Sequence, residues 1–330
     1  MANFENIKLD KGLYRTKKGF LAELESVDPS ENYKGTSLEG LDAFERQLKR
    51  FDIKINGKNS STIDKFFQTT DSAVLFPEYV TRTIRESIAQ ANNLDDIVAA
   101  KTNIEGLDYR SIALTPSKDD LELKYVNEGA FIPETEIKTQ ENHIKLHKRG
   151  RAIVASYESL RFQRLDVFNV MLRQIGMAIS QNLFEDAINT LIMGDGNNNA
   201  IDKTVAGKAL TVDDLTKAVV SLYPYDATTI ITSPEFASKV CLSELFAGKD
   251  KNFATNGTYE TPFGAKIVSY RRPKDYIIAL NKNFALEMVT AGDIMVDSDR
   301  LIDRQLERTA ITQIAGFAKI SKEASKMVEA

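Results

Sequence analysis

Apolar residues near the N-terminus recur three or four positions apart, which is typical of an amphipathic helix. After Ser37 this apolar stripe comprises Leu38, Leu41, Phe44, Leu48 and Phe51. A helix this short cannot bury its stripe alone, so we expect it to dock on the body of the protein or on a neighbouring subunit. A second helix is expected from about Pro77, because proline suits a first turn and Val80 and Ile84 follow at four-residue spacing.

The hydrophobic period changes to two between residues 107 and 157, which predicts strands. Residues 121–126 and 143–156 have the strongest alternation, and an acidic, proline-bearing connection separates them. Ile144 and Leu146 are flanked by His, Lys and Arg, so this ribbon has too little apolar surface to form a domain. We therefore expect a two-stranded arm that projects from the body.

The strongest helical pattern covers residues 166–193, which contain no proline. A helix of this length would extend about 42 Å. Its main stripe comprises Phe168, Leu172, Ile175, Ile179, Leu183, Ala187 and Leu191, and Met171, Ala178, Phe184 and Ile188 widen it. Gly176 costs roughly 1 kcal/mol relative to alanine inside a helix, so we expect a packing reason for it. Gly194 predicts the left-handed stop.

The remaining chain has mixed helical and strand patterns. Helices are expected at 212–223 and from Ser233-Pro234, where a cap precedes a proline. Strands are expected at 228–233, 265–270, 275–281, 285–289, 292–299 and 307–320. Glycine and asparagine interrupt the pattern between residues 247 and 262. The fold class is therefore α+β.

Composition narrows the possible functions. The 330 residues include 43 Lys and Arg against 47 Asp and Glu, so the net charge is −4. This balance disfavours a protein whose main task is to hold phosphate backbones, and any contact with nucleic acid should be weak or local. The single cysteine, Cys241, excludes an intramolecular disulfide and nearly excludes a structural zinc site. We expect no signal peptide and no membrane span, since long apolar runs are absent from the sequence.

Motifs that could carry chemistry have simpler explanations. His143 and His147 would lie about 13 Å apart on a strand, too far to share one metal ion. The GDG at Gly194 follows a helix, whereas a phosphate loop precedes one. Cys241 lies among apolar residues, where a packed thiol is the ordinary role. We therefore expect no catalytic residue, no cofactor and no metal.

One basic cluster stands out, formed by Lys145, Lys148, Arg149 and Arg151. A solvated strand face explains such a cluster. The alternative follows from residues 127–141 of the same arm, which are acidic and include Glu134 and Glu136. Opposite charges on one arm favour docking of this arm on another subunit.

The order of these elements resembles the tailed-bacteriophage major capsid proteins of the Hong Kong 97 (HK97-like) type. The likeness is carried by the long helix ending in MGDG, by PFGAKIVSY at 262–270, and by the closing strand that ends in FAKI at 317–320. It extends over roughly residues 73–320. Each motif is weak alone, and their order and spacing make the match specific.

The resemblance implies a domain for each stretch of the chain. The N-terminal arm would be 1–72, the first helix and entry to the peripheral domain 73–106, and the extended loop 107–157. The spine helix and peripheral domain would be 158–209, the axial domain 210–283, and the return to the peripheral domain 284–330. The N-terminal arm is short for a cleaved scaffolding segment, so we expect it to be retained.

The resemblance also implies a function. Copies of the chain would form pentamers and hexamers of an icosahedral head in the virion, assembled in the bacterial cytoplasm around double-stranded DNA. Scaffold, portal and decoration proteins are the expected partners besides the chain itself. Expected intersubunit contacts are the N-terminal stripe (Leu38, Leu41, Phe44, Leu48), the basic cluster, and Glu134 and Glu136. Expected hinges or turns are Gly150, Gly194, Gly196 and Gly257.

Two other functions stay open. An encapsulin-like nanocompartment would share this fold, and the long N-terminal segment disfavours it because cargo docks near that end. An α/β enzyme is the alternative of a different class. It is disfavoured because no convergent polar constellation is visible.

Overall fold

The computed structural model describes residues 4–16, 18–91, 93–113, 123, 125–132, 138–197, 200–207, 209–243 and 263–330. The chain has the predicted α+β architecture and divides into two compact units. The first unit comprises Met1–Ala91, Arg149–Gln181 and Ile294–Gln313, and the second comprises Asn92–Lys148, Asn182–Asp293 and Ile314–Ala330. None of the helices in these described ranges is long and apolar enough to cross a bilayer.

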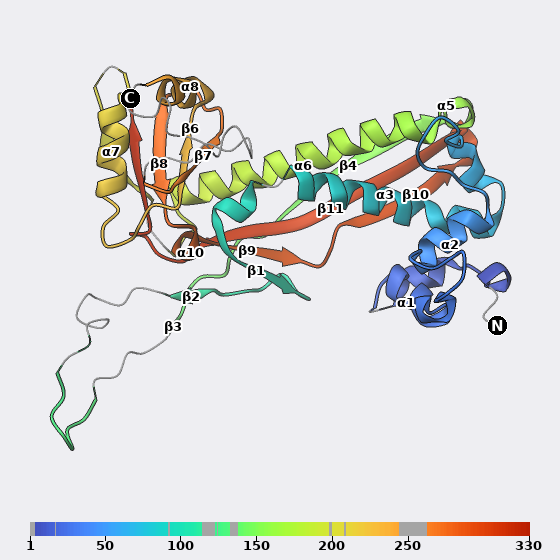
Figure 1. Ribbon diagram of the computed structural model, residues 1–330, viewed down its shortest axis with the longest axis horizontal. Coiled ribbons are helices and arrows are strands. Elements are labelled where there is room, and N and C mark those ends of the chain that lie inside the picture. Colours follow the sequence, from blue (N-terminus) through green and yellow to red (C-terminus); the bar gives the residue numbers. More distant parts are fainter. Residues whose placement is uncertain are drawn as a thin grey trace. The chain divides into compact units, whose positions relative to one another are not determined.

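Helices dominate the first unit (Figure 1). They are α1 (Phe20–Val27), α2 (Ala43–Arg50), α3 (Thr70–Gln90), α5 (Tyr157–Phe162) and the first part of α6 (Leu165–Met193). Short 3-10 turns in this unit are η1 (Phe4–Asn6), η2 (Lys11–Arg15), η3 (Ser30–Tyr33), η4 (Ile63–Phe67) and η6 (Ile302–Arg304). One apolar core joins the N-terminal segment, α3 and α6.

The N-terminal helix contributes to this core. α2 begins at Ala43, five residues after the first residue of its predicted stripe, because Asp42 and Glu45 form a capping box. Phe44 and Leu48 are only 1% and 5% exposed, within the same core as α3. The prediction that these two residues are intersubunit contacts is therefore wrong, since their own chain already covers them. Leu38 and Leu41 precede the helix and are half-buried, and their intersubunit role stays a prediction.

A buried arginine holds the N-terminal segment together. Arg46 is fully buried, and its Nε donates to Asp28 Oδ2 at 2.7 Å. Its Nη1 donates to the Leu41 carbonyl at 2.6 Å, and its guanidinium lies 4.3 Å from the centroid of the Tyr33 ring. A buried charge is tolerated only when it is paired and hydrogen-bonded in this way. The segment before α3 is therefore a folded part of the first unit.

The second helix starts earlier than predicted. Thr69 caps α3 through a reciprocal pair with Ser72, so the helix begins at Thr70 and Pro77 lies inside it. The Tyr14 hydroxyl donates to the Val74 carbonyl at 2.7 Å and accepts from the Glu78 amide at 3.1 Å. It satisfies backbone groups beside the proline, which has no amide hydrogen to donate.

Strands complete the first unit. They are β10 (Met295–Leu301), most of β4 (His147–Ser156) and the first half of β11 (Leu306–Lys319). β10 and β11 are antiparallel, from Met295 opposite Thr312 to Leu301 opposite Leu306. Gly150 lies inside β4, where an added Cβ would approach Thr312 Cγ2 to 2.7 Å. The prediction of a hinge or turn at Gly150 is therefore wrong, and close packing against β11 accounts for the glycine.

The long helix α6 confirms the strongest sequence prediction and contributes residues to both units. An added Cβ on Gly176 would lie 2.6 Å from the Ser87 Cβ of α3, which is the packing reason we expected. Gly194 and Gly196 have φ of 87° and 89°, which confirms the predicted stop and turn. Two members of the predicted stripe, Met171 and Ala178, are exposed, so the buried face is narrower than the pattern indicates.

The second unit contains a sheet of order β5-β12-β8-β6-β7. Its strands are β5 (Asp202–Val205), β12 (Ser325–Glu329), β8 (Tyr276–Leu280), β6 (Thr229–Thr232) and β7 (Lys266–Ser269). Helices α7 (Val212–Val220) and α8 (Pro234–Leu242) pack against it, and Ser233 caps α8 as predicted (Figure 1). β5 and β12 lie outside the stretch 210–283 that we expect to be the axial domain.

A second set of strands supports the extended segment. β1 (Val98–Ile104) runs parallel to β9 (Leu286–Ala291), and β9 pairs with residues 315–319 of β11 in antiparallel fashion. β2 (Ile112–Ala113) pairs with β3 (Lys138–Thr139), while η5 (Leu94–Asp96) and α10 (Lys282–Ala285) adjoin β1 and β9 in sequence. The sequence patterns missed β1, β12 and α1.

Some predictions fall where the structure gives no description. Glu134, Glu136, Gly257 and most of the 247–262 stretch lie outside the described residues. In the strand predicted at 121–126, the described positions 123, 125 and 126 are not in a strand. The strand predicted at 143–156 begins only at His147. Within the described part of the segment, the strands are β2, β3 and β4.

Candidate assembly surfaces

Large apolar side chains on the extended segment point into solvent. Leu123, Tyr125, Phe131 and Ile132 are 97%, 109%, 101% and 76% exposed. We call these four residues the loop tip. Single exposed apolar residues are common, but four large ones exposed within ten positions of the chain are a candidate interaction surface. The alternation of apolar and polar residues did not predict that these side chains are exposed. The available signal was the presence of Tyr125 and Phe131 on either side of Glu128 and Gly129.

The base of the same segment is packed in contrast to its tip. Ile144, Val289 and Ala318 are buried there, and Ile104 and Tyr109 pack against them. The chain returning from the tip crosses β11 closely, since an added Cβ on Gly316 would lie 2.5 Å from the Lys145 carbonyl oxygen. Glycine at this position lets the returning chain lie directly on the strand. The loop tip therefore extends from a base with a defined position.

Polar contacts hold both sides of this base. The Gln140 amide donates to the Ser111 carbonyl at 2.8 Å, which links the outgoing and returning chain beside β2 and β3. The Asn142 amide donates to Asn197 Oδ1 at 2.7 Å, and Asn142 Nδ2 donates to the Gly196 carbonyl at 3.1 Å. The turn after α6, which the sequence predicts only as a helix stop, is thus also an anchor for the returning chain.

A buried lysine lies under the same base. Lys319 is fully buried near the end of β11, its amide donates to Asp195 Oδ2 at 2.8 Å, and its carbonyl accepts from Gln140 Nε2 at 3.3 Å. Its Nζ lies 3.4 Å from the Leu191 carbonyl. Burial lowers the pKa of Lys319 to about 8, because the charged ammonium loses its hydration.

The predicted basic cluster is exposed. Lys145, Lys148, Arg149 and Arg151 all face solvent, on β4 and just before it. Their expected acidic counterparts, Glu134 and Glu136, lie outside the described residues. Exposure agrees with a solvated strand face and with docking on another subunit, so the docking role stays a prediction.

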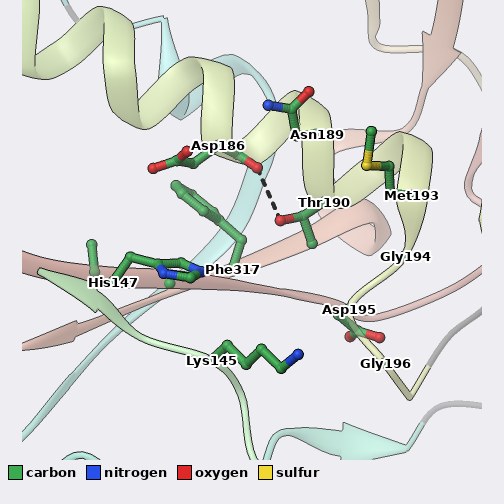
Figure 2. A pocket seen from close by; sticks show the side chains of 12 residues that line it. Lys145, His147, Asp186, Asn189, Thr190, Met193, Gly194, Asp195, Gly196 and Phe317 are labelled. Atoms are coloured by element: carbon green, nitrogen blue, oxygen red, sulfur yellow. Dashed lines mark hydrogen bonds between the residues drawn. The ribbon is translucent and has the colours of Figure 1, made fainter.

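A cavity of about 280 Å³ lies beside the base of the segment, within the second unit (Figure 2). Lys145 and His147 border it on the returning chain, and Asp186, Asn189 and Thr190 border it on α6. The Thr190 hydroxyl donates to its own helix, to the Asp186 carbonyl at 2.9 Å. The lining contains no cysteine or serine nucleophile. Within the described ranges, no three His, Cys, Asp or Glu side chains are arranged to hold a metal ion.

A second apolar surface lies on α6, within the first unit. Val167, Val170, Met171 and Met177 are between 37% and 58% exposed. Their spacing of three, four and ten places them along one helix face. We call these four residues the α6 stripe. The opposite face of α6, with Phe168 and Leu172, is buried in the core. Because both faces of α6 carry apolar residues, the spacing of apolar residues in the sequence does not show which face is buried in the core and which is exposed.

A family profile described as phage capsid protein matches residues 139–316, more than half of the chain. That match includes α6, the second-unit helices and most of β11. No curated protein matches the chain.

Solved structures share the fold at low sequence identity. The capsid of a native GTA particle has a TM-score of 0.52 and 15% identity, covering 75% of this chain and 90% of that chain. The capsid of an empty GTA particle has a TM-score of 0.52 and 14% identity, covering 72% and 89%. A virus-like particle from Pyrococcus furiosus has a TM-score of 0.50 and 15% identity, covering 76% and 98%. At these identities the likeness concerns the fold alone.

Proposed function

The chain belongs to the phage capsid protein family, and we propose that its copies assemble as pentamers and hexamers into the icosahedral head of a tailed phage. The head encloses double-stranded DNA, and assembly takes place in the cytoplasm of the bacterial host. The family match is to phage capsid proteins, which favours this function over a nanocompartment that stores cargo. We propose a structural role without catalytic turnover, which the same match supports.

The observation that carries this proposal is the exposure of the loop tip. Burial of a large apolar side chain contributes about 1.5–3 kcal/mol relative to exposure in water. In an isolated chain, the four side chains of the loop tip stay in water and do not gain this free energy of burial. A shell surrounds each copy with identical neighbours, so it offers every loop tip a protein surface to cover. The occupant we propose is therefore a second copy of this chain.

We propose that the α6 stripe is the surface that receives the loop tip of another copy. Both surfaces are apolar, both are exposed in the single chain, and every copy carries one of each. A contact between two different patches of the same chain is head-to-tail, and such contacts close into rings when the rotation permits. Pentamers and hexamers are rings of this kind.

The N-terminal segment is retained in this proposal. Its residues Phe44 and Leu48 lie in the core of the first unit, and Arg46 is buried with Asp28. Removal of the segment would expose the apolar faces of α3 that it covers. A cleaved scaffold is normally released from a body that folds without it, so this burial supports retention.

Other partners follow from the proposed head. A net charge of −4 suits a shell that encloses DNA and contacts it weakly. Portal, scaffold and decoration proteins are further partners that such a head requires or accepts.

A single-cysteine labelling experiment tests the proposal. The chain has one native cysteine, so Cys241→Ser combined with Phe131→Cys places one thiol at the loop tip. We expect fast maleimide labelling in dissociated chains and at least about tenfold slower labelling in particles, because a neighbour covers the tip. Adding Val170→Cys should give disulfide-linked dimers in particles under mild oxidation. Equal labelling in both states would contradict burial of the tip.

A further inference from the structure

A buried carboxylate lies at the base of the extended segment. Glu287 is on β9 and is 7% exposed. Its Oε1 accepts hydrogen bonds from the Thr102 hydroxyl at 2.5 Å and from the Tyr109 hydroxyl at 2.8 Å. Its Oε2 accepts a hydrogen bond from the Ser111 hydroxyl. Thr102 lies in β1, and Tyr109 and Ser111 lie in the stretch that leads from β1 into β2, on the way to the loop tip.

The three hydroxyl donors match the acceptor oxygens of the Glu287 carboxylate. An ionised carboxylate only accepts hydrogen bonds, and three hydroxyls are the donors that it needs when no cation is near. Hydrogen bonds to a charged acceptor are roughly twice as strong as neutral ones. The outgoing chain is therefore held by one side chain at three points.

The pKa of the Tyr109 hydroxyl agrees with its role as a hydrogen-bond donor to Glu287. Burial raises the pKa of Tyr109, and its hydrogen bond to Glu287 raises that pKa further. The hydroxyl therefore remains a hydrogen-bond donor to a higher pH than a free tyrosine would. Tyr109 also packs against the buried Ile144 and Val289, so the polar and apolar parts of the base meet at this residue.

The returning chain is held differently. The Gln140 amide donates to the Ser111 carbonyl, and Asn142 donates through its amide to Asn197 Oδ1 and through its Nδ2 to the Gly196 carbonyl. Ser111 therefore takes part in both anchors, with its hydroxyl on Glu287 and its carbonyl on Gln140. A change at Glu287 would loosen the outgoing chain first and leave the sheet under it in place.

We propose that Glu287 is a positioning residue for assembly: its three hydroxyl contacts hold the chain up to residue 113 on the second unit, and so set where the loop tip meets the next copy. This inference rests on the proposed shell function. The contacts that hold the outgoing chain lie within a single copy, so their effect on hydrogen exchange can be measured in chains that have not assembled.

The test compares two substitutions of the same size. Glu287→Leu removes every acceptor and leaves three hydroxyls unpaired, whereas Glu287→Gln keeps one acceptor oxygen and offers an amide to Ser111. In dissociated chains we expect Glu287→Leu to speed hydrogen exchange in residues 105–113 by about tenfold and to leave β6 and β8 unchanged. We expect particle yield to fall by about tenfold with Leu and to stay near the wild-type yield with Gln.

Several results would overturn the inference. Unchanged exchange in residues 105–113 for Glu287→Leu would show that the carboxylate does not clamp the chain. Faster exchange with a normal particle yield would show that the clamp does not control assembly. Where Glu287→Leu does not fold, Tyr109→Phe and Ser111→Ala each remove one donor and should shift exchange in the same direction by less. If even the wild-type chain forms no particles, the proposed function fails, while the exchange measurement still decides the clamp.

Discussion

The hydroxyl of Tyr14 accepts a hydrogen bond from the amide of Glu78, 64 positions later in the chain, at 3.1 Å. The same hydroxyl donates to the Val74 carbonyl, so a side chain from the N-terminal segment completes the hydrogen bonding of α3. Burial raises the pKa of Tyr14, so the phenol keeps its proton to a higher pH than a free tyrosine would. The N-terminal segment is thereby joined to the helix that carries the core of the first unit.

Tyr14→Phe should lower the free energy of unfolding by about 1–3 kcal/mol, because a buried carbonyl and amide lose their partner. Urea unfolding of the dissociated chain measures this change. Tyr125→Phe is the matched control, since that phenol is fully exposed at the loop tip and should have no effect on unfolding. Equal stability of the Tyr14→Phe variant and the wild type would mean that the Glu78 amide and the Val74 carbonyl bond directly to each other within α3.

Phe44→Ala should destabilise the dissociated chain by about 3–5 kcal/mol, because it leaves a cavity in the first-unit core. Leu41→Ala should cost far less, since Leu41 is half-buried and lies outside that core. Circular dichroism with chemical unfolding compares the two. A large loss of assembly from Phe44→Ala at unchanged stability would restore the intersubunit role that the structure removes.

Gly176→Ala should destabilise the first unit by about 1–3 kcal/mol, because the added methyl overlaps the Ser87 side chain and must push α3 from α6. Gly207→Ala is the control, since an added Cβ there meets nothing within 4 Å. Thermal unfolding of both variants gives the comparison. A stabilised Gly176→Ala chain would show that the two helices separate easily.

Lys319→Met should change how stability depends on pH. The pKa of Lys319 falls from 10.5, its ordinary value, to about 8 in the fold, so the unfolded chain binds more protons between those values. The contribution of Lys319 to the free energy of unfolding therefore rises as pH increases through that window.

The methionine variant removes this rise, and it should be more stable than the wild type near pH 7 by on the order of 2 kcal/mol. Unfolding measured at about pH 7 and about pH 9.5 tests the sign. Lys203→Met on the exposed strand β5 is the control and should leave the slope unchanged. A parallel pH profile for Lys319→Met and the wild type would contradict the buried ammonium.

Long, regular patterns in this chain predict the fold well. The α6 pattern gives its end at Met193, and the Ser233-Pro234 pair gives the start of α8, because both signals are local. Thr69 and Ser72 start α3 through a capping pair that the proline at 77 obscures. The helix tolerates that proline because Tyr14 arrives from a distant segment, which no local pattern records.

The candidate surfaces are harder to predict for a physical reason. Phe44 and Phe131 are both apolar residues in polar surroundings, yet one lies in the core and the other is fully exposed. Their sequences cannot distinguish them, because burial depends on whether the rest of the same chain supplies a partner. The clamp at Glu287 has the same origin, since its donors lie about 180 positions away and meet it only through the pairing of β1 with β9.

Sedimentation velocity and cryo-electron microscopy of the purified full chain test directly whether it forms a shell. We expect closed icosahedral particles of many copies, with residues 125–132 of each copy covered by a neighbour. A triple variant, Tyr125→Ser with Phe131→Ser and Ile132→Ser, should remain folded and lose particle formation. Wild-type chains that stay monomeric or dimeric at high concentration, with the loop tip still in solvent, would contradict shell formation.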